Sequence, residues 1–170
     1  YGSVGSTFGI SSGKWYWEVT TVSSGGSHGL VGIKKSNETG TYPGGTAESY
    51  AYQTDGQKFN NSSGAAYGAT FTTNDVIGVA FDADAGTLTF YKNNSSQGQA
   101  FSGLTNGPYV PVVGDQANAT QYTWLVNFGQ NAQSGLTLDS ASGGYFQYEP
   151  PTAFKALSTA NLPDPLIDVP

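Results

Sequence analysis

The sequence predicts an all-β fold, an antiparallel sandwich, and three observations support this prediction. Apolar and polar residues alternate along short segments, which is the period of a half-buried strand. Gly, Ser, Thr, Asn and Tyr are abundant while charged residues make up only 11%, a composition that favours strands and turns over helices. Turn sequences recur about every 8–12 residues, as in sandwiches and barrels.

The first expected strand is Gly13–Val19, "GKWYWEV". Alternation places Trp15 and Trp17 on one face of this strand, and Tyr16 and Glu18 on the other. Two readings of the aromatic residues compete: a platform for stacking sugar rings, or the core of a sheet. The pattern favours the core for both tryptophans, leaves Tyr16 undecided, and predicts that Glu18 pairs with a lysine or caps backbone groups.

The central strands follow in order. Gly29–Ile33 is a short apolar run after a Gly/Ser-rich segment, and Glu48–Gln53 alternates before an Asp-Gly turn. Asp75–Asp82 is almost continuously apolar, which predicts a strand covered on both faces. Thr87–Lys92 follows a hairpin turn in which Gly86 is expected to adopt positive φ.

Two more strands and a tail complete the chain. Pro108–Val113 contains two prolines, so we expect it at the edge of a sheet or at a strand end. Thr123–Gly129 is the last expected strand. We therefore predict a sandwich over residues 1–130, and an irregular, proline-rich C-terminal tail over 131–170 with one short helical turn. The tail residues expected to pack on the sandwich are Phe146, Phe154 and Leu157.

Several segments together resemble the SPRY domain family, over about Ser11 to Gln130: "SGKWYWEV", "GLVGI", "YAYQTDGQKFN", "DVIGVAFDADAGTLTFYKN" and "PYVPVV…TWLVNFGQ". The resemblance implies a bent sandwich of two antiparallel sheets, related to the concanavalin-like jelly rolls, and a non-enzymatic binding role. The aromatic residues expected to be structural are Trp15, Trp17, Phe81, Phe90, Trp124 and Phe128.

The chain also departs from the family pattern. Only "YGSVGSTFGI" precedes the first strand, where the family usually has one or two more strands. The best-known members bind peptides through loops at one end, with a tryptophan near the position of Val113–Asp115, and that tryptophan is missing here. Methionine is absent throughout, so we expect a piece of a longer protein. The ending "PPTAFKALSTANLPDP" resembles SPRY-like domains of phage and prophage structural proteins, which predicts a location on the surface of a virion.

Composition argues against several classes of function. The net charge is −6 and arginine is absent, which disfavours nucleic-acid binding. No apolar run approaches the ~20 residues that a membrane-spanning helix needs, and cysteine is absent. His28 is the single histidine, and Asp82–Gly86 resembles a turn more than a calcium loop. We expect no metal, no cofactor and no enzyme activity; a glycan hydrolase is kept only as a remote alternative, because Glu18 stands alone on its strand.

The expected binding residues lie in tyrosine-, glycine- and serine-rich loops, a composition that provides rigid contact surface at low entropic cost. The predicted surface comprises Tyr42, Tyr52, Asp55, His28 and Asp115. For the tyrosines, burial in a strand is an equally good interpretation. We predict a binding module of a phage-type virion protein that presents these loops to a glycan or protein of the host. The alternative is a structural domain whose edge strands contact neighbouring virion subunits.

Overall fold

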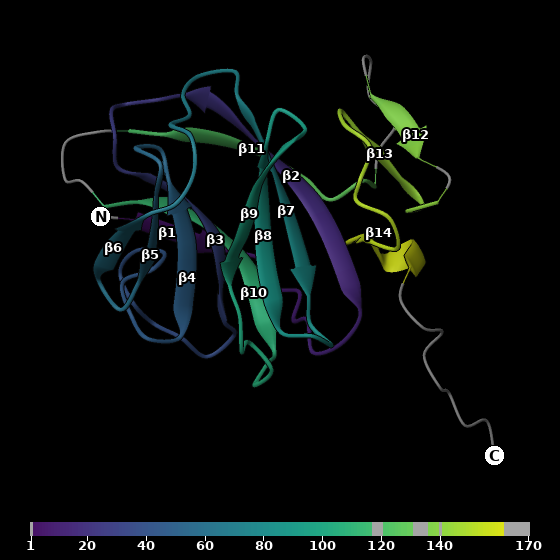
Figure 1. Ribbon diagram of the computed structural model, residues 1–170, viewed down its shortest axis with the longest axis horizontal. Coiled ribbons are helices and arrows are strands. Elements are labelled where there is room, and N and C mark those ends of the chain that lie inside the picture. Colours follow the sequence, from purple (N-terminus) through teal and green to yellow (C-terminus); the bar gives the residue numbers. More distant parts are fainter. Residues whose placement is uncertain (1, 117–120, 131–135, 140, 162–170) are drawn as a thin grey trace.

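The computed structural model describes residues 2–116, 121–130, 136–139 and 141–161. Two antiparallel sheets face each other and form a sandwich, which confirms the predicted fold class (Figure 1). The first sheet has the order β1-β10-β3-β4-β5-β6. Its strands are β1 (Gly2–Gly5), β10 (Tyr109–Asp115), β3 (Gly29–Lys35), β4 (Ser49–Gln53), β5 (Gln57–Asn60) and β6 (Ser63–Ala66).

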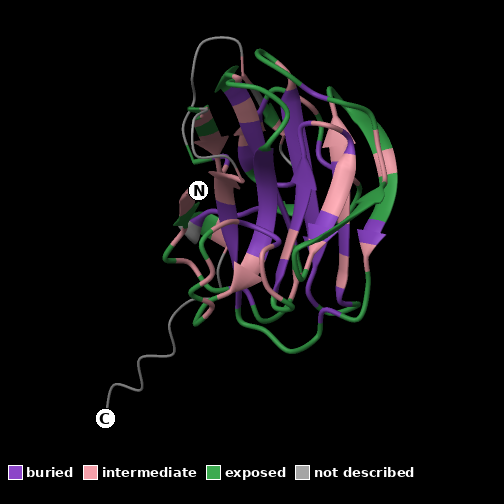
Figure 2. Cartoon of the chain, turned by 90° about the vertical axis from the view of Figure 1, so that its left-hand side faces the viewer, coloured by how far each residue is buried: buried purple, intermediate pink, exposed green. Residues whose placement is uncertain are grey.

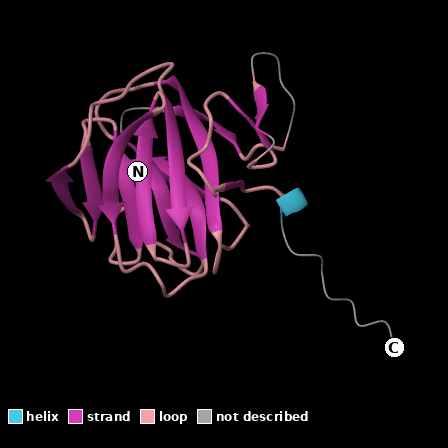
Figure 3. Cartoon of the chain, turned by 45° about the vertical axis from the view of Figure 1, so that its right-hand side comes forward, coloured by secondary structure: helices cyan, strands magenta, loops and turns pink. Residues whose placement is uncertain are grey.

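The second sheet has the order β11-β2-β7-β8-β9, and β14 pairs in parallel with β2. Its strands are β11 (Thr123–Asn127), β2 (Lys14–Ser23), β7 (Val76–Asp82), β8 (Thr87–Lys92), β9 (Ser95–Phe101) and β14 (Lys155–Ala156). A small hairpin of β12 (Thr137–Asp139) and β13 (Gly144–Phe146), together with a single 3-10 turn at Thr159–Asn161, lies to one side of the sandwich (Figure 3).

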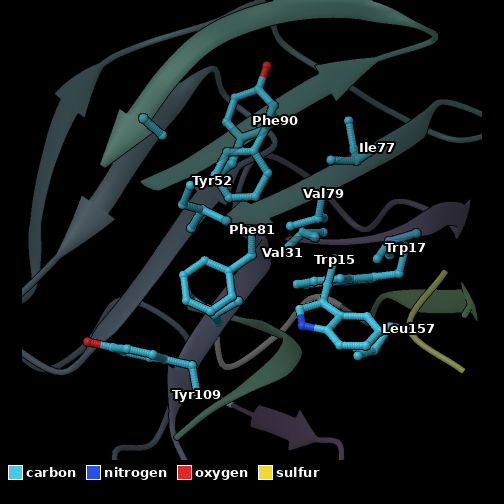
Figure 4. Packing of buried hydrophobic residues seen from close by; sticks show 14 of the residues in the cluster. Trp15, Trp17, Val31, Tyr52, Ile77, Val79, Phe81, Phe90, Tyr109 and Leu157 are labelled. Carbon is cyan, nitrogen blue, oxygen red and sulfur yellow. The ribbon is translucent and has the colours of Figure 1, made fainter. Parts of the chain in front are cut away.

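The hydrophobic core fills the space between the two sheets, where the strands are most buried (Figure 2). Trp15 and Trp17 lie in this core together with Phe81 and Phe90, as the alternation predicted (Figure 4). The prediction holds only in part for Trp124 and Phe128, which are half-buried. The reason is their position on or just beyond β11, an edge strand that has a neighbour on one side only.

The C-terminal segment packs on the outer face of the second sheet, mainly over β2. The ring of Phe146 meets the ring of Tyr16 edge-on, with centroids 5.0 Å apart. Ala156 also packs into this cluster, and its strand β14 pairs with β2. Every residue of β7 is buried. On its outer face, Gly78 lies under the ring of Tyr16, and Ala80 packs in the same cluster as Tyr16, Phe146 and Ala156.

Glu18 anchors this segment through backbone groups rather than through a lysine. Its carboxylate is 2% exposed and accepts hydrogen bonds from the N–H groups of Gln147, at 2.8 Å, and Tyr148, at 2.9 Å. The Tyr16 hydroxyl donates to the same carboxylate at 3.4 Å. Burial raises the pKa of Glu18, and it outweighs these hydrogen bonds, which lower it. The predicted backbone-capping role of Glu18 is confirmed.

The proline-containing strand was expected at a sheet edge or with its prolines at a strand end. The edge position is wrong, because β10 lies between β1 and β3, whereas Pro108 does lie at the end, directly before the first residue of β10. Pro111 is tolerated there for a local reason. Its carbonyl accepts a hydrogen bond from the Ser6 N–H, so its nitrogen also points toward the β1 side. Since β1 ends at Gly5, the missing N–H of Pro111 falls where the strand neighbour has just ended.

Residues after 130 are less irregular than expected, since β12, β13 and β14 form within the described part of this segment. Phe146 and Leu157 are buried there and Phe154 is half-buried. Residues 162–170, the end of the expected tail, lie outside the described residues. Strands β1, β5, β6 and β9 were also missed, and β1 lies ahead of the first expected strand. Three of them, β1, β6 and β9, are sheet edges whose residues are mostly exposed or half-buried, so they carry little hydrophobic alternation.

The turn between β7 and β8 has the predicted geometry. Gly86 has a φ of 65°, and the Asp82 carboxylate accepts hydrogen bonds from the N–H groups of Asp84 and Ala85 at 3.1 and 2.9 Å. The same carboxylate lies 3.0 Å from the ammonium group of Lys14. Burial alone would raise the pKa of Asp82, but the Ala85 N–H and Lys14 outweigh it and hold this pKa below its usual value.

Replacing Asp82 by asparagine is expected to cost about 1 kcal/mol at neutral pH, because Lys14 is partly exposed and its ion pair is screened. A carboxyl group whose pKa is lowered in the folded state stabilises the fold at pH values above the ordinary aspartate pKa. This stabilisation is lost as the pH falls through the lowered pKa. Urea unfolding at several pH values should therefore show Asp82→Asn approaching the wild type in strong acid. A destabilisation that grows on acidification would contradict the ion-pair account.

Candidate functional site at one end of the sandwich

Three of the predicted binding residues meet at one end of the sandwich. His28 directly precedes β3, Asp55 follows β4, and Asp115 ends β10. Because these strands are antiparallel neighbours, the start of β3 lies beside the ends of both others: Gly29 is opposite Asp115, and Leu30 is opposite Gln53. Tertiary pairing thus gathers residues that are far apart in the sequence.

Two predicted residues lie elsewhere. Tyr52 is 0% exposed, and its ring packs in the core against Tyr67, Phe71 and Phe90 with centroids 5.1, 4.9 and 5.3 Å away. Its hydroxyl donates to the carbonyl of Ala69. Burial raises the pKa of Tyr52. The expected position of Tyr52 on a loop surface is wrong, because Tyr52 is opposite the core residue Val31 in the β3–β4 register, and its side chain therefore points into the sandwich, beside Phe90 (Figure 4).

Tyr42 is half-buried on the outer face of the first sheet. It packs against the cluster of Leu30, Ala51 and Phe59, and its hydroxyl donates to the Ser62 hydroxyl at 2.9 Å. The loop that carries Tyr42 therefore folds back over the sheet. Tyr42 does not join the three residues that meet at the end.

An aromatic pair completes this end of the molecule. The rings of Tyr122 and Trp124 stack with centroids 5.4 Å apart and an angle of 7° between their planes. Both rings lie against Gly29, where an added Cβ would sit 2.5 Å from the Tyr122 ring and 2.9 Å from the Trp124 ring. The hydroxyl of Tyr122 accepts a hydrogen bond from the His28 N–H at 2.9 Å. The pair is thus fixed in place by backbone groups of the first sheet.

Asp55 is held by neighbouring amide groups. Its carboxylate accepts from the Gln57 backbone N–H at 3.0 Å and from the Gln57 side-chain amide at 2.6 Å. The side-chain amide of Gln53 is buried and lies 3.0 Å from the side-chain amide of Gln116. When the Gln53 amide nitrogen is turned toward Asp55, it lies 3.1 Å from both oxygens of the Asp55 carboxylate. Gln116 in turn donates its N–H to the His28 carbonyl at 3.0 Å.

We call this region the end surface. It comprises His28, Gln53, Asp55, Asp115, Gln116, Tyr122 and Trp124. His28 is exposed, whereas Asp55, Asp115 and both rings are half-buried. The end surface therefore combines flat aromatic area, two carboxylates and amide groups that hydrogen bonds hold in fixed positions, which is the composition of a recognition surface.

A second surface lies between the edge strands β1 and β11. An apolar pocket of about 150 Å³ opens there. It is lined by Val4, Gly5, Ser6, Trp17, Pro111, Val112, Val113, Val126 and Phe128. Val4 is 72% exposed beside it. We call this region the open-edge groove; it offers hydrophobic contact and almost no polar groups.

The acidic residues considered for catalysis or metal binding have structural roles. Glu18 is buried under the C-terminal segment, and Asp82 is engaged by its turn and by Lys14. Within the described residues, no group of three or more His, Cys, Asp or Glu side chains is arranged to hold a metal ion. No helix in that same part of the chain is long and apolar enough to cross a membrane.

A rigid two-layer sandwich that presents loop side chains at one end is the architecture of a binding module. The family model of the SPRY domain matches residues 14–131. The chain belongs to the SPRY domain family, which consists of protein-interaction modules.

The curated relatives that match this chain include animal proteins. It is 37% identical over 125 residues to the Ran-binding proteins 9/10 homolog of Drosophila melanogaster, covering 71% of this chain and 13% of that protein. It is 39% identical over 124 residues to human Ran-binding protein 9, and the match covers 70% of this chain and 16% of that protein. It is 38% identical over 124 residues to Xenopus tropicalis Ran-binding protein 9, and the match covers 70% of this chain and 22% of that protein. The chain therefore spans less than a quarter of these relatives' length.

The crystal structure of the SPRY domain of human HERC1 has the same fold. It superposes with a TM-score of 0.63 at 21% identity, covering 73% of this chain and 79% of that one. At this level of identity, the likeness shows the fold alone.

Sequence reasoning missed the aromatic pair as part of a surface, because Trp124 was assigned to the core. The signal was present: Tyr122 and Trp124 are two residues apart, and that spacing puts both rings on one side of an extended chain. What the sequence could not provide is the facing glycine. Gly29 lies far away in the chain and reaches the rings only after the two sheets pack.

Proposed function

We propose that this chain is a non-enzymatic module that binds an extended segment of a partner protein at the end surface. One observation carries the proposal: the strand ends that carry His28, Asp55 and Asp115 meet at the end of the sandwich where backbone contacts hold a stacked aromatic pair in place. A surface of fixed aromatic rings and polar groups loses little entropy on binding, so its contact energy is retained as affinity.

A host glycan is the second kind of ligand considered for this surface, because aromatic rings also stack on sugars. The virion setting is supported only by the sequence of the C-terminal ending, while the matched relatives are animal proteins. We propose the setting as a separate hypothesis. Mass spectrometry of purified virions from the source of this sequence would support it by detecting the chain as a stoichiometric component, and would refute it by finding the chain only outside particles.

Assembly through edge strands is the alternative function, and the open-edge groove favours it. Val4 is exposed on β1, and the groove below it is apolar. A neighbouring subunit that added a strand there would cover both features. Light scattering separates the two functions. A defined oligomer that Val4→Asp converts to monomers supports assembly, whereas a monomer that binds peptides supports recognition.

The test of the proposed function is selection of ligands for the 170-residue chain from a random peptide library, with a glycan array as a parallel arm. Tyr122→Ala is expected to weaken binding of the selected peptides at least about tenfold, since a central aromatic contact typically contributes that much. Gly29→Ala should weaken binding as well, because the added methyl group displaces the rings of Tyr122 and Trp124 although both side chains are still present.

Leu125→Ala is the matched control, since Leu125 is 50% exposed on the same strand as Trp124 and alternation turns it to the opposite face. Binding that survives both Tyr122→Ala and Gly29→Ala would refute the end surface as the site. Binding of glycans but not of peptides would replace the protein ligand with a carbohydrate.

A further inference from the structure

We infer that Gln116 of the end surface accepts a hydrogen bond from a main-chain N–H of the bound segment, through a side-chain oxygen whose direction Asp55 determines. This inference rests on the function proposed above and adds which chemical group of the ligand is recognised. It follows from a chain of hydrogen bonds that runs from the Asp55 carboxylate through the side-chain amide of Gln53 to the side-chain amide of Gln116.

The Asp55 carboxylate is the end of this chain that determines its direction, because an ionised carboxylate only accepts hydrogen bonds. It accepts from the backbone N–H and from the side-chain amide of Gln57, at 3.0 and 2.6 Å. The side-chain amide of Gln53 also lies 3.1 Å from both carboxylate oxygens. An amide oxygen in that place would face two other oxygens, so the Gln53 nitrogen must point toward Asp55.

The direction of the Gln53 amide determines the direction of the Gln116 amide. With its nitrogen toward Asp55, Gln53 directs its oxygen toward Gln116, 3.0 Å away. That oxygen only accepts, so Gln116 must direct its own nitrogen toward Gln53 and turn its oxygen away. Gln53 is 2% exposed, so water does not replace these partners. Each hydrogen bond also polarises the next one, which makes the Gln116 oxygen a stronger acceptor.

The Gln116 oxygen is available to a ligand. Gln116 is half-buried, and among the described residues its side chain forms a hydrogen bond with Gln53 alone. The N–H groups of Gln53 and Gln57 already satisfy the charge of Asp55, so the end surface offers a neutral amide oxygen at this point. A neutral N–H matches such an oxygen, and the main chain of an extended segment provides one at every residue except proline.

The main chain of His28 connects Gln116 to the aromatic pair. The Gln116 N–H donates to the His28 carbonyl at 3.0 Å, and the His28 N–H donates to the Tyr122 hydroxyl at 2.9 Å. Gln53 is opposite Leu30 of the outer cluster, so the two amides meet on the outer face of the first sheet. The rings lie on the other face, against the residue before Leu30. A segment that crosses the end of the sheet over His28 therefore contacts both features within a few extended residues of about 3.3 Å each.

The experiment uses peptides selected from the random library with the whole 170-residue chain. Each main-chain N–H of a selected peptide is replaced in turn by an ester oxygen, which removes one donor and keeps the shape. We expect one position, a few residues from the one that contacts the rings, at which the ester weakens binding about tenfold. Gln116→Ala should bind the amide and ester peptides equally at that position. The matched control is Gln99→Ala, an exposed glutamine on the far edge strand β9, which should keep the full difference.

Asp55→Asn tests whether the carboxylate determines the direction of the amides. Asparagine donates as well as accepts, so it allows the amides of Gln53 and Gln116 to turn over. The ratio of amide to ester affinity should therefore fall toward one in this variant. Because both peptides are measured on the same protein, a general loss of stability or affinity does not change this ratio.

The outcomes separate the two proposals. Suppose that binding depends on Tyr122 and Gly29, but no ester replacement distinguishes the wild type from Gln116→Ala, or Asp55→Asn keeps the full ratio of amide to ester affinity. Either result overturns the inference and leaves the proposed function standing. Peptides whose binding does not depend on Tyr122 or Gly29 overturn the proposed function, and the inference with it.

Discussion

Replacement of Glu18 by alanine is expected to lower the free energy of unfolding by roughly 3 kcal/mol. Each broken hydrogen bond to a charged group costs about 1.5–3 kcal/mol, and removing a buried charge offsets part of this loss. The change removes the acceptor for the Gln147 and Tyr148 N–H groups and for the Tyr16 hydroxyl. Urea unfolding measures the loss of stability. Hydrogen exchange should show faster exchange at Gln147 and Tyr148, because the C-terminal segment loses its anchor.

Glu149→Ala is the matched control, because Glu149 is an exposed glutamate in the same segment. It should leave both stability and exchange nearly unchanged. If Glu18→Ala is equally mild, the carboxylate does not anchor the segment, and the packing of Phe146 on Tyr16 must be sufficient by itself.

The raised pKa of Glu18 also has a pH signature. A carboxyl group whose pKa is higher in the folded state contributes stability that is present below its ordinary pKa and is lost as the pH rises through the raised value. Glu18→Gln removes the titrating group, so any stability advantage of the wild type over this variant should shrink as the pH rises through that window. Constant destabilisation across pH would contradict the burial argument.

Tyr52→Ala is expected to be at least as damaging, with a loss of about 4 kcal/mol, the usual cost of truncating a large buried aromatic side chain. Tyr52 contacts three other aromatic rings and has no exposed surface. Such a loss is a large share of the 5–15 kcal/mol that typically stabilise a domain. Chemical denaturation of the purified variant measures the change.

Tyr52→Phe is the matched control, because it keeps the ring and removes only the hydroxyl that donates to the Ala69 carbonyl. It should cost about 1 kcal/mol, the usual net contribution of one hydrogen bond. A Tyr52→Ala variant that unfolds like the wild type but loses peptide binding would return Tyr52 to the binding surface and contradict its placement in the core.

Much of the fold could be predicted from local pattern. The period of two along β2 assigned Trp15 and Trp17 to the core, and the continuous apolar run of β7 indicated that it is covered on both faces. The turn at Asp82–Gly86 was also predictable, since its hydrogen bonds join residues two or three positions apart. Strands β6 and β9 were missed because exposed edges do not need alternation.

The candidate site was predictable only in part. Loop composition identified His28, Asp55 and Asp115, which meet at one end, but it could not separate them from Tyr42 and Tyr52. Alternation predicts that neighbouring residues of a strand point to opposite faces, but it does not predict which face is turned toward the core. Tyr52 is buried because its face of the first sheet packs against the second sheet.

The sequence by itself determined the class of fold, the core strands, the tight turn after β7 and the acidic, arginine-free character of the chain, because these depend on composition and on residues near one another. Only the tertiary structure decided which ends of the strands meet, that Gly29 leaves room for the Tyr122–Trp124 pair, and that the C-terminal segment covers Glu18. Those contacts join residues as many as 130 positions apart, and no local pattern records a partner at that distance.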